Sequence, residues 1–232
     1  MTSLLKDKLF VLSLIGFITL CQMEYFHLLH PLDTWVYSQA MHAAYSQSGL
    51  YFWYMLTNIG SGFFVYTMLV VFASSLLFKI RSKKIILYIL LIIALFNLPL
   101  LIKLLFAVPR PVGFAAFYPE LKSYAFPSGH AFNAVVLFYF TPRFLRDFVY
   151  PNTSPSTTMS LFLSVPFEVI GILLIALSRV FLGVHWFSDI VGGVLLGLVI
   201  CRLLLMCKKW ALAKAQSSKL HAPSRVEGKA QS

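Results

Sequence analysis

The stretch at residues 178–189, Ser-Arg-Val-Phe-Leu-Gly-Val-His-Trp-Phe-Ser-Asp, lies between two long apolar runs and contains Arg179, His185 and Asp189. Ionisable side chains at membrane depth are energetically costly, so they mark a candidate functional site. His185 and Asp189 are four residues apart, which predicts that they share one face of a helix, with Cβ atoms about 5–6 Å apart. A carboxylate in that place can hold one imidazole nitrogen and leave the other free to attack a substrate.

The composition is that of a membrane protein. Of the 232 residues, 59% are hydrophobic and 12% are charged, whereas soluble domains carry about 25% charged residues. Several apolar runs approach 20 residues, the length needed to cross a bilayer as a helix. The net charge of +11 could indicate nucleic-acid binding. We exclude that class of partner, because the basic residues cluster at the ends of apolar runs, as membrane topology requires.

The apolar runs predict an all-α bundle of six transmembrane helices, at residues 9–29, 54–78, 85–106, 128–148, 160–181 and 186–207. Apolar side chains also recur at helical spacing over 30–49, between the first two spans, which predicts an amphipathic helix in the membrane interface. Pro99 is expected to kink the third span.

The predicted domain organisation is simple. Residues 1–207 form a single membrane domain, in which Gly193 and Gly197 have the spacing of closely packed helices. Residues 208–232 are basic and polar and are expected to form a disordered tail. The sequence predicts no oligomeric state.

The basic residues also predict the orientation in the membrane. Six spans put both termini on one side, and that side receives fifteen of the 19 Lys and Arg residues. The opposite side receives the other four, which are Lys103, Arg110, Lys122 and Arg179. By the positive-inside rule, the termini are cytoplasmic and the four remaining cations lie on the extracytoplasmic side, where they need a local reason.

Three short stretches meet on that extracytoplasmic side: Lys103 with Arg110-Pro111, then Pro127-Ser128-Gly129-His130, then residues 178–189. Lys103, Arg110 and Arg179 can converge on an anion, and arginine suits the oxygens of a phosphate. Ser128 and Gly129 open a helix, whose free backbone N–H groups also favour a phosphate. His130 and His185 are then available as a general acid and a nucleophile.

These motifs closely resemble the type-2 phosphatidic acid phosphatase family, a pattern shared with vanadium-dependent haloperoxidases and bacterial acid phosphatases. The family pattern is Lys-x6-Arg-Pro, Pro-Ser-Gly-His and Ser-Arg-x5-His-x3-Asp, and this sequence matches each position. The resemblance implies that His185 is the nucleophile, that Asp189 orients it and that His130 protonates the leaving oxygen. It also implies that Lys103, Arg110, Ser128, Gly129 and Arg179 bind the phosphoryl oxygens, without a metal or another cofactor.

The expected function is that of a membrane-embedded lipid phosphatase in a bacterial inner membrane, with the active site facing the periplasm. The family includes enzymes for undecaprenyl diphosphate, phosphatidylglycerophosphate and lipid A, which the motifs do not distinguish. Lys122 could supply a further cation for a diphosphate. A lipid phosphotransferase, a vanadate-dependent haloperoxidase and a lipid-phosphate transporter are the alternatives. Glu24 and Glu168 are expected to make polar contacts inside the bundle.

Overall fold

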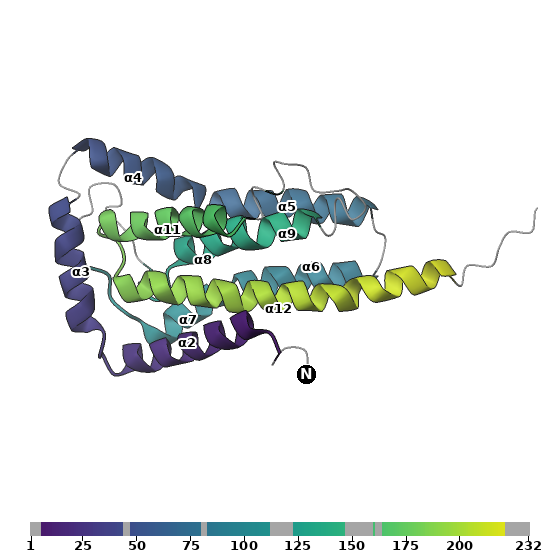
Figure 1. Cartoon of the computed structure of the whole chain (residues 1–232), viewed down its shortest axis with the longest axis horizontal. Coiled ribbons are helices and arrows are strands. Elements are labelled where there is room, and N and C mark those ends of the chain that lie inside the picture. The colour runs from purple at the N-terminus through teal and green to yellow at the C-terminus, as the bar shows by residue number, and fades with distance from the viewer. Residues whose placement is uncertain are drawn as a thin grey trace, which may run out of the picture.

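The computed structural model describes residues 6–43, 47–79, 83–111, 123–146, 160 and 164–220. Every regular element in these ranges is helical. The helices run along one axis, except α3 (His30–Ala43), which stands across their ends (Figure 1). The predicted all-α class is therefore confirmed within the described residues. A helix follows the first span as predicted, over 30–43 rather than 30–49, and its place in the membrane interface stays a prediction.

Four helical segments are long and apolar enough to cross a membrane: Lys8–Tyr25, Gly49–Ser75, Ile86–Phe106 and Phe187–Cys207. They correspond to the first, second, third and sixth predicted spans. The fourth predicted span begins with α8 (Gly129–Val135), η1 (Val136–Phe140) and α9 (Thr141–Phe144), and it is helical to residue 146, the last described residue before a gap. The fifth is α11 (Val165–Phe181), of 17 residues. The count of six spans stays a prediction.

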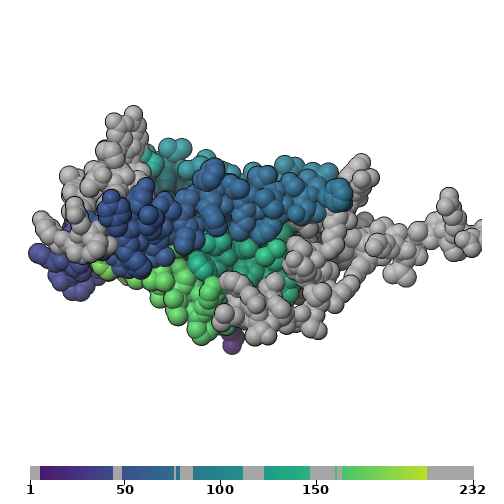
Figure 2. All heavy atoms as spheres, turned by 90° about the horizontal axis from the view of Figure 1, so that it is seen from above, coloured from purple at the N-terminus to yellow at the C-terminus, as the bar shows by residue number. Residues whose placement is uncertain are grey.

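The second span begins earlier than predicted. Helix α4 (Gln47–Ile59) already contains the aromatic residues 51–54, and it packs on α11 by stacking Trp53 on Phe181 with ring centroids 4.4 Å apart. It ends at Gly60, where a Cβ atom would lie 2.5 Å from a methyl carbon of Ile175. Helix α5 (Gly62–Lys79) then continues the span and packs on α8, and Figure 2 shows α4 and α5, in blue, following each other along this face of the molecule.

Prolines interrupt two other spans. The third span is divided into α6 (Lys83–Phe96) and α7 (Leu98–Phe106), and the break at Asn97 directly precedes Leu98-Pro99, so the predicted kink is confirmed. Pro142 has no N–H to donate to residue 138. The preceding turn widens into the π-helix η1, where the N–H of Thr141 donates to the carbonyl of Val136. A proline that removes a helical hydrogen bond is a common cause of such a change in pitch.

Helix α12 (Phe187–Leu220) runs through the middle of the bundle and packs on α2 (Lys8–Tyr25) and α8. A Cβ atom on Gly193 would lie 2.4 Å from the carbonyl oxygen of Ser128, and one on Gly197 would lie 2.9 Å from Cβ of Val135. The predicted close packing at these glycines is therefore confirmed. The helix does not end with the apolar run but continues to Leu220. Residues 208–220 are thus helical, against our expectation, while the tail from 221 onward lies outside the described residues.

Candidate active site

The predicted site residues meet where four helix ends lie close to one another near α3 (Figure 1). The end of α11 and the beginning of α12 both pack on α3. The N–H of Ser128, at the beginning of α8, donates to the carbonyl of Asp189 at 2.9 Å. Arg110, just after α7, donates from Nη1 to the carbonyl of Val184 at 2.6 Å. The three sequence motifs are therefore joined by hydrogen bonds between segments far apart in the chain.

His185 lies at the centre of this arrangement and is 2% exposed. Its Nδ1 is 3.0 Å from Oδ2 of Asp189, and its Nε2 is 3.1 Å from Nη1 of Arg110. Asp189 accepts and the guanidinium donates, so the neutral imidazole carries its proton on Nδ1. The lone pair of Nε2 then points toward Arg110, as a nucleophile beside an anion-binding group requires.

His185 does not share a helix with Asp189, so this part of the prediction was wrong. Gly183 has a φ of 67° in the turn after α11, and α12 begins only at Phe187. Such a positive φ is readily available to glycine. Oδ2 of Asp189 accepts both from His185 and, at 2.8 Å, from the N–H of Trp186. The carboxylate therefore holds the turn against the first turn of α12, which brings the pair together without a shared helix face.

The charge of its surroundings keeps His185 neutral. Burial lowers the pKa of this imidazole well below its ordinary value of 6.5, and the positive charges of Arg110, Arg179 and Lys103 lower it further. A protonated imidazole has no lone pair on Nε2 and cannot attack a substrate. Desolvation and like charges both disfavour the protonated form, so the site maintains the reactive form at neutral pH.

Lys103 and Arg110 donate hydrogen bonds mainly to backbone carbonyl groups of residues 123–125. The Nζ atom of Lys103 donates to the carbonyls of Tyr124 and Ala125, both at 2.7 Å. Arg110 donates from Nε to the carbonyl of Ser123 at 2.7 Å and from Nη2 to its hydroxyl at 2.9 Å. Within the described part of the chain, neither cation is paired with a carboxylate. Their positive charge is thus available to an anion.

Arg179 and the start of α8 complete the group. Arg179 is 2% exposed, and its Nη1 donates to the hydroxyl of Thr57 at 2.8 Å. Ser128 is the N-cap of α8, and its side chain accepts from the N–H of Ala131. Gly129 has no atom within 4 Å of an added Cβ position, so the backbone at this turn is open on that side. His130 follows, close enough to Arg179, Arg110 and Lys103 for their charges to act on it.

The structure also shows a contact that the sequence did not reveal. Asp33 of α3 is 4% exposed and accepts from the N–H and the hydroxyl of Ser188, at 2.8 and 2.7 Å. These two bonds fasten the interfacial helix to the first turn of α12, next to Asp189. A carboxylate within an aromatic interfacial segment could have indicated a polar contact, but its partner Ser188 lies 155 residues away in the chain.

Other predicted residues have different positions. Glu168 accepts from Arg143 at 2.6 and 3.2 Å, which confirms a polar contact inside the bundle, at the opposite end of α11 from Arg179. Glu24 is buried near the end of α2, 8% exposed. Lys122, the proposed extra cation, lies outside the described residues.

Comparisons with known proteins identify the family and the fold. The sequence pattern of the PAP2 superfamily matches residues 82–212. Phosphatidylglycerophosphatase B of Bacillus subtilis (strain 168) is 37% identical over 79 residues, which are 34% of this chain and only 36% of that relative. The crystal structure of a transmembrane PAP2-type phosphatidylglycerolphosphate phosphatase from Bacillus subtilis matches with a TM-score of 0.72 at 22% identity, over 87% of this chain and 96% of that one. With the four apolar helices, the shared fold identifies an integral membrane protein.

Proposed function

Because the chain belongs to the PAP2 superfamily, we propose that it is a membrane-embedded phosphatase that hydrolyses a lipid phosphate through a phosphohistidine on His185. One observation carries this proposal. Nε2 of His185 lies 3.1 Å from the guanidinium of Arg110 while Asp189 holds Nδ1 at 3.0 Å. A nucleophile that faces an anion-binding group and is oriented by a carboxylate is suited to phosphoryl transfer.

The first chemical step forms the phosphoenzyme. The lone pair of Nε2 attacks the phosphorus, and the bond from phosphorus to the ester oxygen breaks. His130 gives its proton to that leaving oxygen, since the negative charge of the bound phosphate offsets the three cations and favours the protonated imidazole. Asp189 stabilises the positive charge that develops on the ring of His185.

The second step releases phosphate. Water attacks the phosphorus of the phosphohistidine, and His130 accepts a proton from that water. The bond between phosphorus and Nε2 breaks, its electron pair returns to the nitrogen, and inorganic phosphate leaves. Lys103, Arg110 and Arg179 stabilise the phosphoryl oxygens in both transition states, as preorganised charges do in a buried site. With three cations in this role, we propose that no metal ion takes part.

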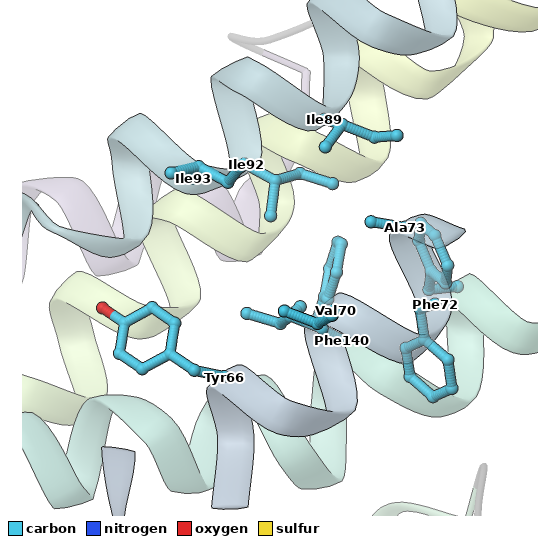
Figure 3. A pocket seen from close by; sticks show the side chains of 10 residues that line it. Tyr66, Val70, Phe72, Ala73, Ile89, Ile92, Ile93 and Phe140 are labelled. Atoms are coloured by element: carbon cyan, nitrogen blue, oxygen red, sulfur yellow. The ribbon is translucent and has the colours of Figure 1, made fainter. Parts of the chain in front are cut away.

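An apolar groove supports a lipid as the substrate. Residues of α5 and α6 face each other across a cavity of about 230 Å³, with Phe140 at its base; these are Tyr66, Val70, Ala73, Ile89, Ile92 and Ile93 (Figure 3). Gly60 contacts Asn133, one turn beyond His130, through a hydrogen bond of 3.0 Å. Tyr66 lies less than two helical turns beyond Gly60. An acyl or prenyl chain in this groove would therefore leave its phosphate near the site.

We propose that the reaction takes place on the outer surface of the membrane. Lys103, Arg110 and Arg179 lie at the end that we expect to be extracytoplasmic, and Asp7 and Arg202 lie together at the other. The substrate is then a lipid phosphate or diphosphate of a bacterial inner membrane with its headgroup facing the periplasm. Undecaprenyl diphosphate, phosphatidylglycerophosphate and lipid A are the substrates to compare.

The test is phosphate release by purified wild type and His185→Ala in detergent with excess chelator. The panel contains these three lipids and phosphatidic acid. Release by wild type alone supports metal-independent histidine catalysis. Phosphate release by the variant at the wild-type rate would overturn the assignment of the nucleophile. Absence of release with every lipid would overturn hydrolysis, and transfer of phosphate to an added lipid alcohol would then identify a phosphotransferase.

A further inference from the structure

A second cavity, of about 550 Å³, lies beside the phosphate site. It is lined by the end of α2, the start of α3, the segment after α7 and Trp186. Two of its residues are chain neighbours of the site: Pro109 precedes Arg110, and Trp186 follows His185. The indole N–H of Trp186 donates to the carbonyl of Pro109 at 2.8 Å. The cavity and the phosphate site therefore share a wall.

Glu24 is one of the polar groups in this cavity that the proposed chemistry does not use. It is 8% exposed and lines the cavity, and its Oε2 is buried without a hydrogen-bond partner among the described residues. An unsatisfied buried carboxylate oxygen costs several times the net free energy of a hydrogen bond. Asp33, on the same wall, has both oxygens occupied by Ser188. Glu24 also adjoins Ser188, and its Oε2 is the carboxylate oxygen on this wall that has no hydrogen-bond partner among the described residues.

The surroundings of Glu24 select the kind of ligand. Helix C-termini carry a partial negative charge, and the cavity lies at the ends of α2 and α7, because its lining includes His27, two residues after α2, and Phe106, the last residue of α7. With Glu24 they disfavour a second anion. The alcohol that carries the phosphate is neutral, and its hydroxyl groups can donate hydrogen bonds to a carboxylate oxygen.

The remaining walls fit an alcohol that carries several hydroxyl groups. His27 and His30 offer imidazole nitrogens that donate or accept hydrogen bonds. The ring of Trp186, held by His30 in a T-shaped contact at 6.0 Å, offers an apolar surface to the carbon atoms of such an alcohol. A volume of about 550 Å³ is several times that of a glycerol group and also admits a sugar ring.

We propose that this cavity binds the hydroxyl groups of the alcohol that carries the phosphate, with Glu24 as hydrogen-bond acceptor. The preferred substrate is then a polyol lipid phosphate, with either a glycerol or a sugar next to the phosphate. This inference rests on the proposed phosphatase function, and it adds a specificity determinant from α2, which lies outside the three motifs.

The test compares substrates with and without free hydroxyl groups in wild type and Glu24→Leu. Phosphatidylglycerophosphate and lipid A supply the glycerol and the sugar, and phosphatidic acid has no further hydroxyl. We expect the variant to raise KM about tenfold for a hydroxylated substrate, the effect of one lost charge-assisted hydrogen bond, and to leave KM for phosphatidic acid unchanged. Which of the two hydroxylated lipids is affected distinguishes glycerol from sugar.

Two further variants and a pair of soluble phosphate esters extend the test. Glu24→Gln removes the charge and retains one acceptor oxygen, so it replaces Glu24→Leu if that variant does not fold. His30→Phe retains the ring beside Trp186 and tests the imidazole of His30 separately. Glycerol 1-phosphate should inhibit wild type more strongly than propyl phosphate, which differs only by its missing hydroxyl groups, and this preference should weaken in Glu24→Gln and disappear in Glu24→Leu.

The outcomes separate the two proposals. Equal effects on all substrates, or no effect on any, would overturn the role of Glu24 while phosphate release by wild type still supports the phosphatase. Wild type without phosphate release from every lipid would instead overturn the phosphatase itself.

Discussion

The cations at the two ends of the bundle have different kinds of partner: carboxylates at one end and neutral acceptors at the other. At one end, Arg143 is paired with Glu168, and Arg202 with Asp7, and both arginines contact Tyr139. At the other end, Lys103 and Arg110 are bonded to carbonyl groups, a hydroxyl and an imidazole. A carboxylate neutralises a cation, whereas a neutral acceptor orients it and leaves its charge. The first end is therefore built for stability and the second for binding an anion.

The largest effect is expected from Arg110→Lys, which keeps the charge but removes the forked donor geometry. The lysine cannot reach Ser123 and His185 at once, so the phosphoryl oxygens lose a preorganised partner. We expect kcat/KM for phosphate release to fall by about 10²–10³, the cost of removing one such donor. Arg143→Lys, at the other end, is the matched control and should change kcat/KM less than about twofold. Similar losses in the two variants would contradict the comparison.

A smaller effect is expected from Asp33→Asn, which tests how the interfacial helix supports the site. The amide can accept one of the two hydrogen bonds from Ser188 but not both, so the first turn of α12 loses part of its support. We expect kcat to fall about tenfold with little change in KM, because a small misplacement of His185 and Asp189 affects the reaction more than binding. Ser188→Ala, which removes only the hydroxyl, should give part of the same loss. A rise in KM at constant kcat would instead place Asp33 in substrate binding.

Glu168→Gln should lower stability and leave catalysis unchanged. Arg143 would lose its charged partner in a position where the carboxylate side chain is 6% exposed and the arginine 20%. We expect a loss of about 1–3 kcal/mol, less than for a fully buried pair because the arginine is partly hydrated. Thermal unfolding in detergent measures the change, and kcat of the folded fraction is the control. A change in kcat without a change in melting temperature would contradict the proposed division between the two ends.

The smallest effect concerns pH. The positive charge of Arg110 helps to keep the pKa of His185 below its ordinary value, so Arg110→Gln should raise that pKa. Protonation then removes the nucleophile at a higher pH, and the acidic limb of the kcat/KM profile should move upward by less than about one unit. Profiles of wild type and variant with the same lipid measure the shift. Movement toward lower pH would show that another group controls the limb.

Much of the architecture could be predicted because it depends on properties of single segments. Apolar length predicted the long spans, Pro99 predicted the break before α7, and the spacing of Gly193 and Gly197 predicted close packing on α8. The boundaries were less accurate. The second span begins at α4, and α12 continues beyond the apolar run, since helices also form where propensity and packing allow them outside the bilayer.

The candidate site could be predicted as a set of residues but not as a geometry. Local spacing indicated that His185 and Asp189 would meet, although a turn rather than one helix face brings them together. The catalytic roles remain proposals, supported by the matching motifs and by the position of Arg110. The sequence did not indicate a role for Asp33, because the role depends on a hydrogen bond with Ser188, which lies 155 residues away in the chain.

By itself, the sequence determined that this chain is a helical membrane protein and which residues carry the phosphatase motifs, because hydropathy and motif spacing are properties of neighbouring residues. Only the tertiary structure decided that Nε2 of His185 faces Arg110, that α3 holds the start of α12, and that Glu24 opens into a second cavity. Each of these depends on how helices rotate and pack against partners tens to more than a hundred residues away, and no local pattern records that rotation.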